Sequence, residues 1–197
     1  MTGTRRLLFA AAACGAVLAL AASADRGLAA GLDRRAFEAV RARRGPVAVK
    51  VARVVSALAE PHVAYPLLAL AAMCGARRSP GWQAVAPCLV VAGGGAARRR
   101  LSRVIARERP PAEAWLAEPE GFSLPSKHTT LAVLTVGAAV RTIGVRGAPA
   151  HAATALAAAA VGASRVCLGV HWPADVVAGW LFAVGWLHLT DPDHHAQ

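Results

Sequence analysis

The chain has 197 residues, of which 56% are hydrophobic and only 17% are charged. This composition argues against an ordinary water-soluble domain, and it excludes intrinsic disorder, which needs low hydrophobicity and high charge. The formal net charge of +11 favours anionic partners. Because the long apolar runs leave no polar face for a nucleic-acid-binding module, we expect membrane lipids, and no nucleic acid, as partners.

The chain begins with a candidate membrane anchor. Arg5 and Arg6 precede an apolar stretch over residues 7–24, whose last positions are small. A cleaved secretory signal shows the same pattern. We favour an uncleaved transmembrane anchor over residues 1–24, because further hydrophobic segments follow and a first helix with Arg on its cytoplasmic flank needs no cleavage.

Residues 25–53 differ in kind, because basic side chains alternate with apolar ones such as Leu32, Phe37 and Val40. A helix lying on the membrane surface would bury these apolar side chains and hold its arginines near lipid phosphates. A solvated basic linker fits the same residues equally well. We describe the segment as basic, amphipathic and interfacial.

Five further hydrophobic segments follow, over residues 58–76, 82–97, 128–145, 148–170 and 172–190. Backbone groups in lipid must be satisfied internally, and these segments lack the alternation of strands, so each is predicted to be a helix. The predicted fold is all-α, a polytopic membrane helix bundle with about six transmembrane helices. Its core covers residues 54–190, and residues 191–197 form a short tail.

A polar cluster of Arg165, His171 and Asp175 interrupts the last two segments. Gly169 can end one helix, and Pro173 suits the first turn of the next. A carboxylate one turn beyond His171 can hold one imidazole nitrogen and leave the other free as a nucleophile or base. Arg165 offers a planar fork for phosphate oxygens. Taken alone, His171 could equally be an ordinary core histidine.

A second cluster, Pro125-Ser126-Lys127-His128, stands immediately before an apolar helix. Ser126 is placed as the N-cap, and the free backbone N–H groups at a helix N-terminus bind anions. The natural role of His128 beside such an anion is to donate a proton to a leaving oxygen. A surface histidine on a plainly capped helix is the competing interpretation.

A third cluster is the basic run over residues 98–109. We interpret residues 98–100 as solvated charges at a helix end. Arg103, Arg107 and Arg109 are spaced so that two or more could line one helical face. Arg109 is the strongest candidate, because Pro110 turns the chain out of the helix directly after it.

These clusters, in this order over about residues 47–189, resemble the motifs of the type 2 phosphatidic acid phosphatase and vanadium haloperoxidase superfamily. The third motif, Ser-Arg-x5-His-x3-Asp, is complete. The second, Pro-Ser-Gly-His, has Lys127 in place of Gly. The first, Lys-x6-Arg-Pro, keeps Arg109 and Pro110 but has Ser102 where Lys is usual. Arg103 and Lys127 are therefore the candidates for the missing cation.

The resemblance implies a lipid phosphate phosphatase that uses no metal and no cofactor. His171 would attack phosphorus and form a phosphohistidine, Asp175 would hold it, and His128 would protonate the leaving alkoxide and later activate water. The residues expected to bind the phosphate are Arg109, Arg165, Ser126, Lys127 and Arg103.

Membrane context selects the substrate class. The candidates are phosphatidate, phosphatidylglycerol phosphate and polyprenyl phosphates or diphosphates; the soluble haloperoxidase branch does not fit the hydropathy. The alternative is a catalytically impaired family member that binds anionic lipid, because the first motif is altered. The sequence makes no prediction of the oligomeric state.

The expected location is the cell membrane, crossed several times. The resemblance implies an active site on the extracytoplasmic side. Only six of the 22 Lys and Arg would then face the cytoplasm, which opposes the usual excess of positive charge on that side. We keep the extracytoplasmic orientation as the expectation. The six are Arg5, Arg6, Arg77, Arg78, Arg141 and Arg146.

Overall fold

The computed structural model describes residues 3–24, 26–76 and 85–191. Within these ranges the chain forms α-helices and one short 3₁₀ turn (Ala112–Ala114), with no strand. The predicted all-α fold is confirmed. The helices are α1 (Gly3–Ser23), α2 (Gly27–Arg43), α3 (Pro46–Ala57), α4 (Pro61–Ala76), α5 (Ala86–Ile105), α6 (Lys127–Thr142), α7 (Ala148–Cys167) and α8 (Pro173–Leu189).

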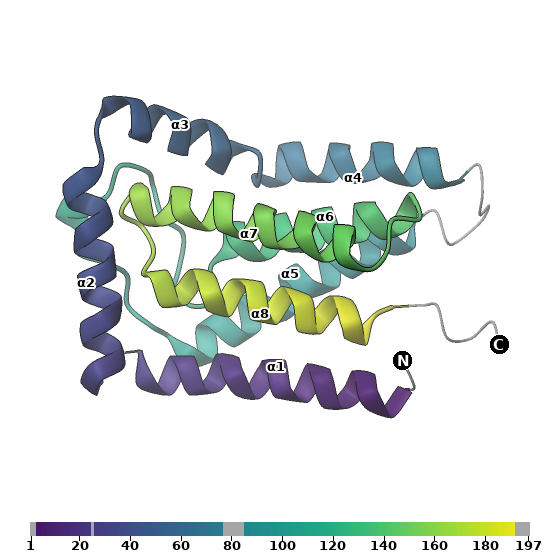
Figure 1. Cartoon of the computed structure of the whole chain (residues 1–197), viewed down its shortest axis with the longest axis horizontal. Helices are drawn as coiled ribbons and strands as arrows, with labels where there is room; N and C mark the ends of the chain where they lie inside the picture. Colours follow the sequence, from purple (N-terminus) through teal and green to yellow (C-terminus); the bar gives the residue numbers. More distant parts are fainter. Residues whose placement is uncertain (1–2, 25, 77–84, 192–197) are drawn as a thin grey trace.

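Most of the helices lie along one direction around α6. Figure 1 shows α1 and α4 to α8 along the long axis, with α2 across one end. Helix α6 packs against α4, α5, α7 and α8, and it contributes Val133 and Leu134 to the main core, where Leu68 and Val91 join them. The N-terminus of α6 therefore lies inside the bundle at the end that α2 crosses.

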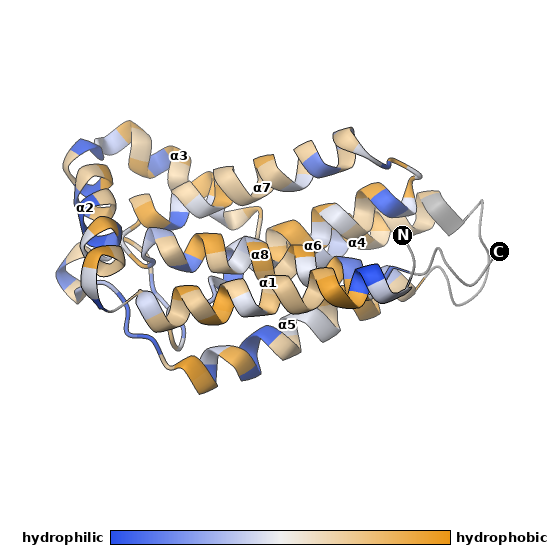
Figure 2. Ribbon diagram, turned by 60° about the horizontal axis from the view of Figure 1, so that its bottom comes forward, coloured by the Kyte–Doolittle hydropathy of each residue, from blue (hydrophilic) through white to orange (hydrophobic). Residues whose placement is uncertain are grey.

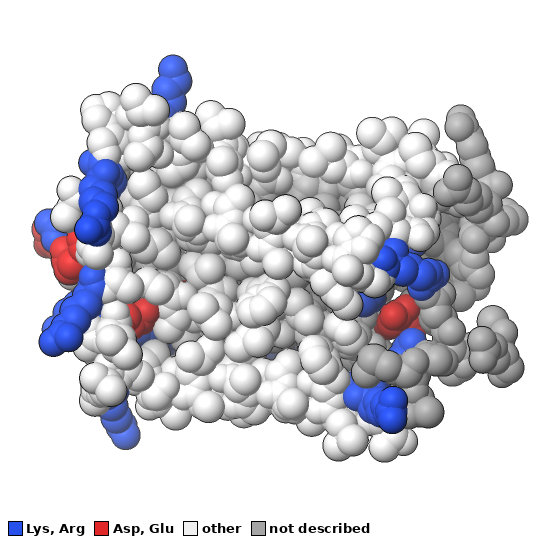
Figure 3. Space-filling view, viewed as in Figure 1, with Lys and Arg blue, Asp and Glu red and all other residues white. Residues whose placement is uncertain are grey.

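The polarity of the molecule is inverted relative to that of a water-soluble protein. Large apolar side chains such as Leu7, Leu70 and Leu156 are exposed, whereas Arg165 and Asp175 are buried. Apolar residues cover the outer faces of the helices (Figure 2), and the visible charged side chains gather at the two ends of the bundle (Figure 3). An apolar belt between two charged ends is the exterior expected of a protein surrounded by lipid.

The six predicted hydrophobic segments correspond to α1 and α4 to α8. Residues 82–84 lie outside the described ranges, and α5 runs on through the basic residues to Ile105 rather than ending at 97. Within the described ranges, α1 is the one helix that is long and apolar enough to span a membrane by itself. Helices α3 and α4, bent by 52°, pass the same test only together, as a broken span or a re-entrant loop. The count of six spans stays a prediction.

The predicted interfacial segment is divided into two helices at Gly45. The following Pro46 stands in the first turn of α3, where its missing N–H costs nothing. Helix α2 crosses the end of the bundle, as an interfacial helix would, but α3 packs along α7. The predicted boundary at residue 53 falls inside α3.

Candidate active site

The connection between α7 and α8 places His171 beside Asp175. Gly169 ends α7 with φ of +77°, and a Cβ at this position would lie 2.0 Å from the carbonyl oxygen of Ala114. Only glycine fits there without movement of the backbone. Asp175, in the first turn of α8, accepts a hydrogen bond from the Trp172 backbone N–H at 2.8 Å and lies 3.3 Å from His171 Nδ1. The predicted turn and the pair one helical turn apart are confirmed.

The second imidazole nitrogen of His171 faces a guanidinium. Arg109 Nη1 lies 3.2 Å from His171 Nε2 and also donates to the Val170 carbonyl. Because a guanidinium only donates, Nε2 is the acceptor and carries the lone pair, and the ring proton lies on Nδ1 toward Asp175. This is the tautomer that a nucleophilic Nε2 requires.

Arg109 is held by the loop before α6. Its Nε donates to the Gly121 carbonyl at 2.8 Å, and its Nη2 donates to the carbonyls of Glu120 and Phe122. With the two contacts of Nη1, all five N–H groups of the guanidinium point at protein acceptors. The loop over residues 120–122 and the turn at Val170 therefore fix the guanidinium against the imidazole.

A buried ion network supports Asp175 from behind. Arg107 donates to Asp175 Oδ1 at 2.6 Å and to Asp33 Oδ2 at 2.7 Å. Asp33 lies on α2 and also accepts from the backbone N–H of Ala174, at the start of α8. Helix α2 thus helps to position the carboxylate that holds His171. Arg107 is a structural partner of Asp175 rather than a free cation.

The second predicted cluster lies at the N-terminus of α6. Ser126 is the N-cap, as predicted, and its Oγ accepts from the Thr129 backbone N–H at 3.5 Å. His128 is buried, and its Nε2 lies 2.7 Å from Glu60 Oε1, between α3 and α4. Lys127 pairs with Glu120 at 2.8 Å instead of standing free beside the histidines.

Arg165 is a buried cation whose charge acts on both histidines. Its Nη1 donates to Ser56 Oγ at 2.7 Å, and its Nε has no hydrogen-bond partner within the described ranges. The charge of Arg165 is close enough to act on both His128 and His171. The second and third motifs also meet directly, because the Ser126 backbone N–H donates to the Asp175 carbonyl at 3.0 Å.

The arginines of the basic run differ in burial. Arg103 is exposed, and no contact joins it to the cluster in the part of the chain that the structure describes. Arg98, which the sequence suggested to be a solvated charge, is buried, so that interpretation is wrong. Its Nε donates to the Pro125 carbonyl at 2.7 Å, and its Nη2 lies 3.5 Å from Ser102 Oγ.

Burial and hydrogen bonding shift the pKa values of the loop residues. It lowers the pKa of His171 to about 4, although the Asp175 carboxylate opposes the shift. Burial also lowers the pKa of Arg109, against the opposing charges of Asp175 and Glu120. The hydrogen bond from Lys127 lowers the pKa of Glu120. His171 is thus neutral near pH 7 and able to present a lone pair.

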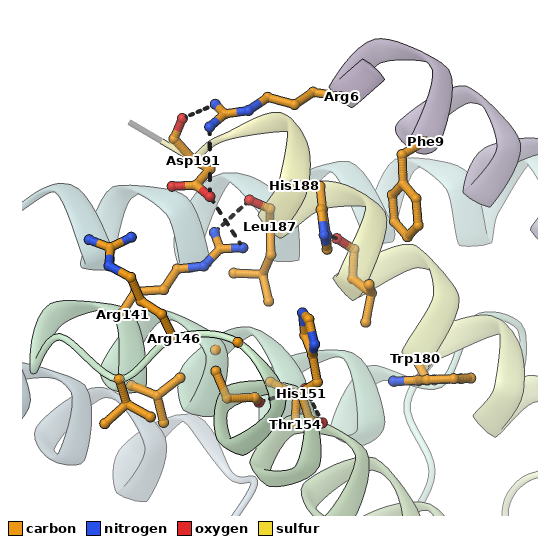
Figure 4. Close-up of a pocket in the computed structure, with 16 residues that line it drawn as sticks. Arg6, Phe9, Arg141, Arg146, His151, Thr154, Trp180, Leu187, His188 and Asp191 are labelled. Carbon is orange, nitrogen blue, oxygen red and sulfur yellow. Dashed lines mark hydrogen bonds and ion pairs between the residues drawn. The ribbon is translucent and has the colours of Figure 1, made fainter. Parts of the chain in front are cut away.

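A separate cavity of about 560 Å³ lies at the opposite end of the bundle, between α1, α8 and the connection from α6 to α7. Figure 4 shows Arg6 and Arg141 on either side of Asp191, with His151 and His188 nearby. None of the predicted site residues lines this cavity.

Comparison with known proteins identifies the family. A family model described as "PAP2 superfamily" matches residues 83–195, more than half of the chain. The chain belongs to the PAP2 superfamily. This range holds the three clusters, so the PAP2 assignment and the resemblance of the motifs rest on the same residues.

Two individual proteins resemble this PAP2 chain. Decaprenylphosphoryl-5-phosphoribose phosphatase of Mycolicibacterium smegmatis is 35% identical over 132 residues, which are 65% of this chain and 69% of that protein. A transmembrane PAP2-type phosphatidylglycerolphosphate phosphatase from Bacillus subtilis superposes with a TM-score of 0.76 at 24% identity, over 91% of this chain and 92% of that one. The second likeness concerns the fold, which is that of a transmembrane protein.

Sequence reasoning missed the groups that hold the catalytic candidates. Asp33 and Glu60 contact Arg107 and His128 across 74 and 68 residues of sequence, and no local pattern marks either acid. Arg98 did carry a signal, because it lies one helical turn before Ser102 and therefore on the same face of α5.

Proposed function

We propose that this protein is a membrane-embedded lipid phosphate phosphatase that works through a phosphohistidine on His171. The supporting observation is the geometry of that imidazole, whose Nδ1–H is held by Asp175 while the Nε2 lone pair faces Arg109. A neutral, oriented imidazole beside a guanidinium suits attack on a phosphorus whose oxygens the guanidinium binds. Membership of the PAP2 superfamily supports the same chemistry.

The proposed reaction has two steps. His171 Nε2 forms a bond to phosphorus as the ester P–O bond breaks, and His128 gives its proton to the leaving alkoxide. Water then attacks the phosphohistidine, His128 takes a proton from it, and orthophosphate leaves as the N–P bond breaks. The Glu60 carboxylate, 2.7 Å from His128 Nε2, favours the protonated imidazole needed in the first step.

Charge stabilisation falls to two arginines and to the start of α6. Arg109 and Arg165 would bind the non-bridging phosphate oxygens, together with the free backbone N–H groups after Ser126. Lys127 would act at the rim of the site, because it is paired with Glu120. Arg103 is exposed and would contribute to binding only at the surface.

The apolar exterior favours a substrate whose phosphate enters the site while its chain stays in the bilayer. Phosphatidate, phosphatidylglycerol phosphate and polyprenyl phosphates or diphosphates fit this description. The name of the M. smegmatis relative favours the polyprenyl class.

The test is release of orthophosphate by the purified full-length chain in detergent. The panel contains the four candidate lipids and a polyprenylphosphoryl-5-phosphoribose, and the variants are His171→Ala and His128→Ala. We expect release from at least one lipid and its loss in both variants. Release by His171→Ala would overturn the mechanism, and lipid binding without turnover by the wild type would favour the impaired, lipid-binding alternative.

We further propose that the protein crosses the cell membrane several times with the site on the extracytoplasmic side. The four native cysteines are free, so a version without them is the starting point. Glu118→Cys marks the site end, and Ala148→Cys marks the opposite end. In intact cells an impermeant thiol reagent should label only the first. The reverse labelling would place the site inside.

A further inference from the structure

We propose that Arg98 is a phosphate-binding residue of the candidate active site and supplies, from one helical turn earlier on α5, the cation missing at Ser102. This inference rests on the proposed function. It concerns which side chain of this chain completes the phosphate site.

Arg98 is a buried cation that no carboxylate of the described residues contacts. Arg98 is 6% exposed, whereas its neighbours Arg99 and Arg100 on the same helix are exposed. Its protein partners are the neutral oxygens of Pro125 and Ser102, and no carboxylate within the described ranges pairs with it. The nearby buried Arg107, in contrast, contacts two carboxylates. A buried cation with no directly paired carboxylate is unfavourable, and within a membrane bundle it marks a functional site.

The position of Arg98 is also that of a phosphate ligand. The carbonyl that orients it belongs to Pro125, the residue before the N-cap of α6, where free backbone N–H groups attract anions. Arg109 and Asp175 are close enough for their charges to act on Arg98. Its Nη1 has no hydrogen-bond partner among the described residues, so a fixed guanidinium retains donors for a phosphate oxygen.

The small side chain at position 102 explains how Arg98 reaches the site. Residues 98 and 102 are stacked on one face of α5, about 6 Å apart along its axis. Arg98 Nη2 lies 3.5 Å from Ser102 Oγ, so the guanidinium occupies the level of residue 102. Ser102 is itself buried, and a lysine there would compete with Arg98 for space and add a second charge.

Arg98 would act by binding alone. Its guanidinium stays protonated and donates hydrogen bonds to non-bridging phosphate oxygens, whose charge grows as the P–O bond breaks. No proton or bond is transferred by Arg98.

The test measures kcat/KM on the best lipid phosphate and the inhibition constant of orthophosphate for purified full-length variants. The variants are Arg98→Ala, Arg98→Gln, Arg98→Lys, Ser102→Lys and the double variant Arg98→Ala/Ser102→Lys. Arg99→Ala and Arg100→Ala are matched controls, because both residues are exposed on the same helix. His171→Ala is the inactive reference.

We expect Arg98→Ala and Arg98→Gln to lower kcat/KM about 10²-fold and to weaken inhibition by orthophosphate, as removal of one oriented donor does elsewhere. Arg98→Lys should be intermediate, and the double variant should recover most of the loss. Ser102→Lys alone should lower activity, and the two controls should match the wild type.

Two outcomes would overturn the role of Arg98. One is an unchanged orthophosphate inhibition constant in Arg98→Gln, which would make Arg98 a structural support of the Pro125 turn. The other is a double variant that folds, by size-exclusion chromatography, but is no better than Arg98→Ala. If the wild type releases no phosphate from any lipid, the proposed function has failed instead.

Discussion

Both ends of the bundle hold histidines, arginines and carboxylates, in very different arrangements. The end crossed by α2 has His128, His171, Asp175, Arg98, Arg109 and Arg165. The other end has His151, His188, Asp191, Arg6, Arg141 and Arg146.

The difference lies in burial and in what the carboxylate holds. Asp175 is fully buried and fixes an imidazole, whereas the Asp191 carboxylate lies 3.8 Å from Arg6 and 3.9 Å from Arg141 and is partly exposed. His188 Nδ1 donates to the Val184 carbonyl of its own helix. Suitable residue types are therefore not enough for a site, which also needs lone pairs and donors held in place and shielded from solvent.

The largest expected difference between the two ends is in the effect of removing one histidine from each, His171 or His188. His171→Ala should lower phosphate release by at least about 10³-fold, because it removes the nucleophile of a unit that acts together. His188→Ala should leave release within about twofold of the wild type, since its ring packs on Phe9 away from the cluster. Steady-state phosphate release in detergent measures both. Equal losses would break the distinction between the two ends.

The glycines that end α7 and α6 offer a second test, by thermal unfolding and by activity. Gly169→Ala places a Cβ against the Ala114 carbonyl and should prevent the native turn, so we expect strongly reduced folding and activity. Gly144→Ala has φ of +85° but open space, so only the strain of about 1–2 kcal/mol applies. A Gly169→Ala protein as stable and active as the Gly144→Ala protein would show that the close turn is unnecessary.

Removal of an acid that contacts arginine at each end of the bundle should give a smaller effect. Asp33→Asn removes one carboxylate from Arg107 and should draw the Asp175 carboxylate away from His171, with about a tenfold loss of kcat. Asp191→Asn should change kcat less than twofold, because its ion pairs are partly exposed and long. An unchanged kcat in Asp33→Asn would show that α2 does not help to position Asp175.

The smallest expected effect concerns the charge of His171, which should not change near neutral pH. Its pKa is lowered to about 4 by burial, so the imidazole is neutral from pH 7 down to about pH 5 and is protonated only near pH 4. The unfolded chain takes up this proton near pH 6.5, so the contribution of His171 to stability decreases as the pH falls from there toward 4. NMR of ¹³C-labelled histidine, with His171→Ala for assignment, measures the midpoint. A midpoint near 6.5 would contradict a desolvated nucleophile.

The sequence predicted the parts of the site that have local patterns. His171, Asp175 and the N-cap Ser126 follow from turn and capping chemistry within a few residues, and their local geometry is confirmed. Asp33 and Glu60 could not be predicted in the same way, because their partners are brought to them only by packing of α2 and the α3–α4 bend against the bundle.

The basic run of α5 shows a different limit. Charge near a helix end suggested solvent for Arg98, whereas tertiary packing buries it and leaves Arg103 exposed. Successive residues of a helix point about 100° apart, so consecutive arginines face different surroundings. Hydropathy averages over them and cannot tell which arginine ends a membrane segment in solvent and which is buried as a phosphate ligand.

The saturated hydrogen bonding of Arg109 has a consequence for selectivity. A lipid phosphate can bind this guanidinium only by taking donors from backbone carbonyls or from the His171 lone pair. A doubly charged terminal phosphate competes well for such donors, since bonds to ionised acceptors are roughly twice as strong as neutral ones. The singly charged diesters that form the surrounding bilayer compete less well. We therefore expect this exchange to favour a phosphate monoester over the diester lipids of the bilayer.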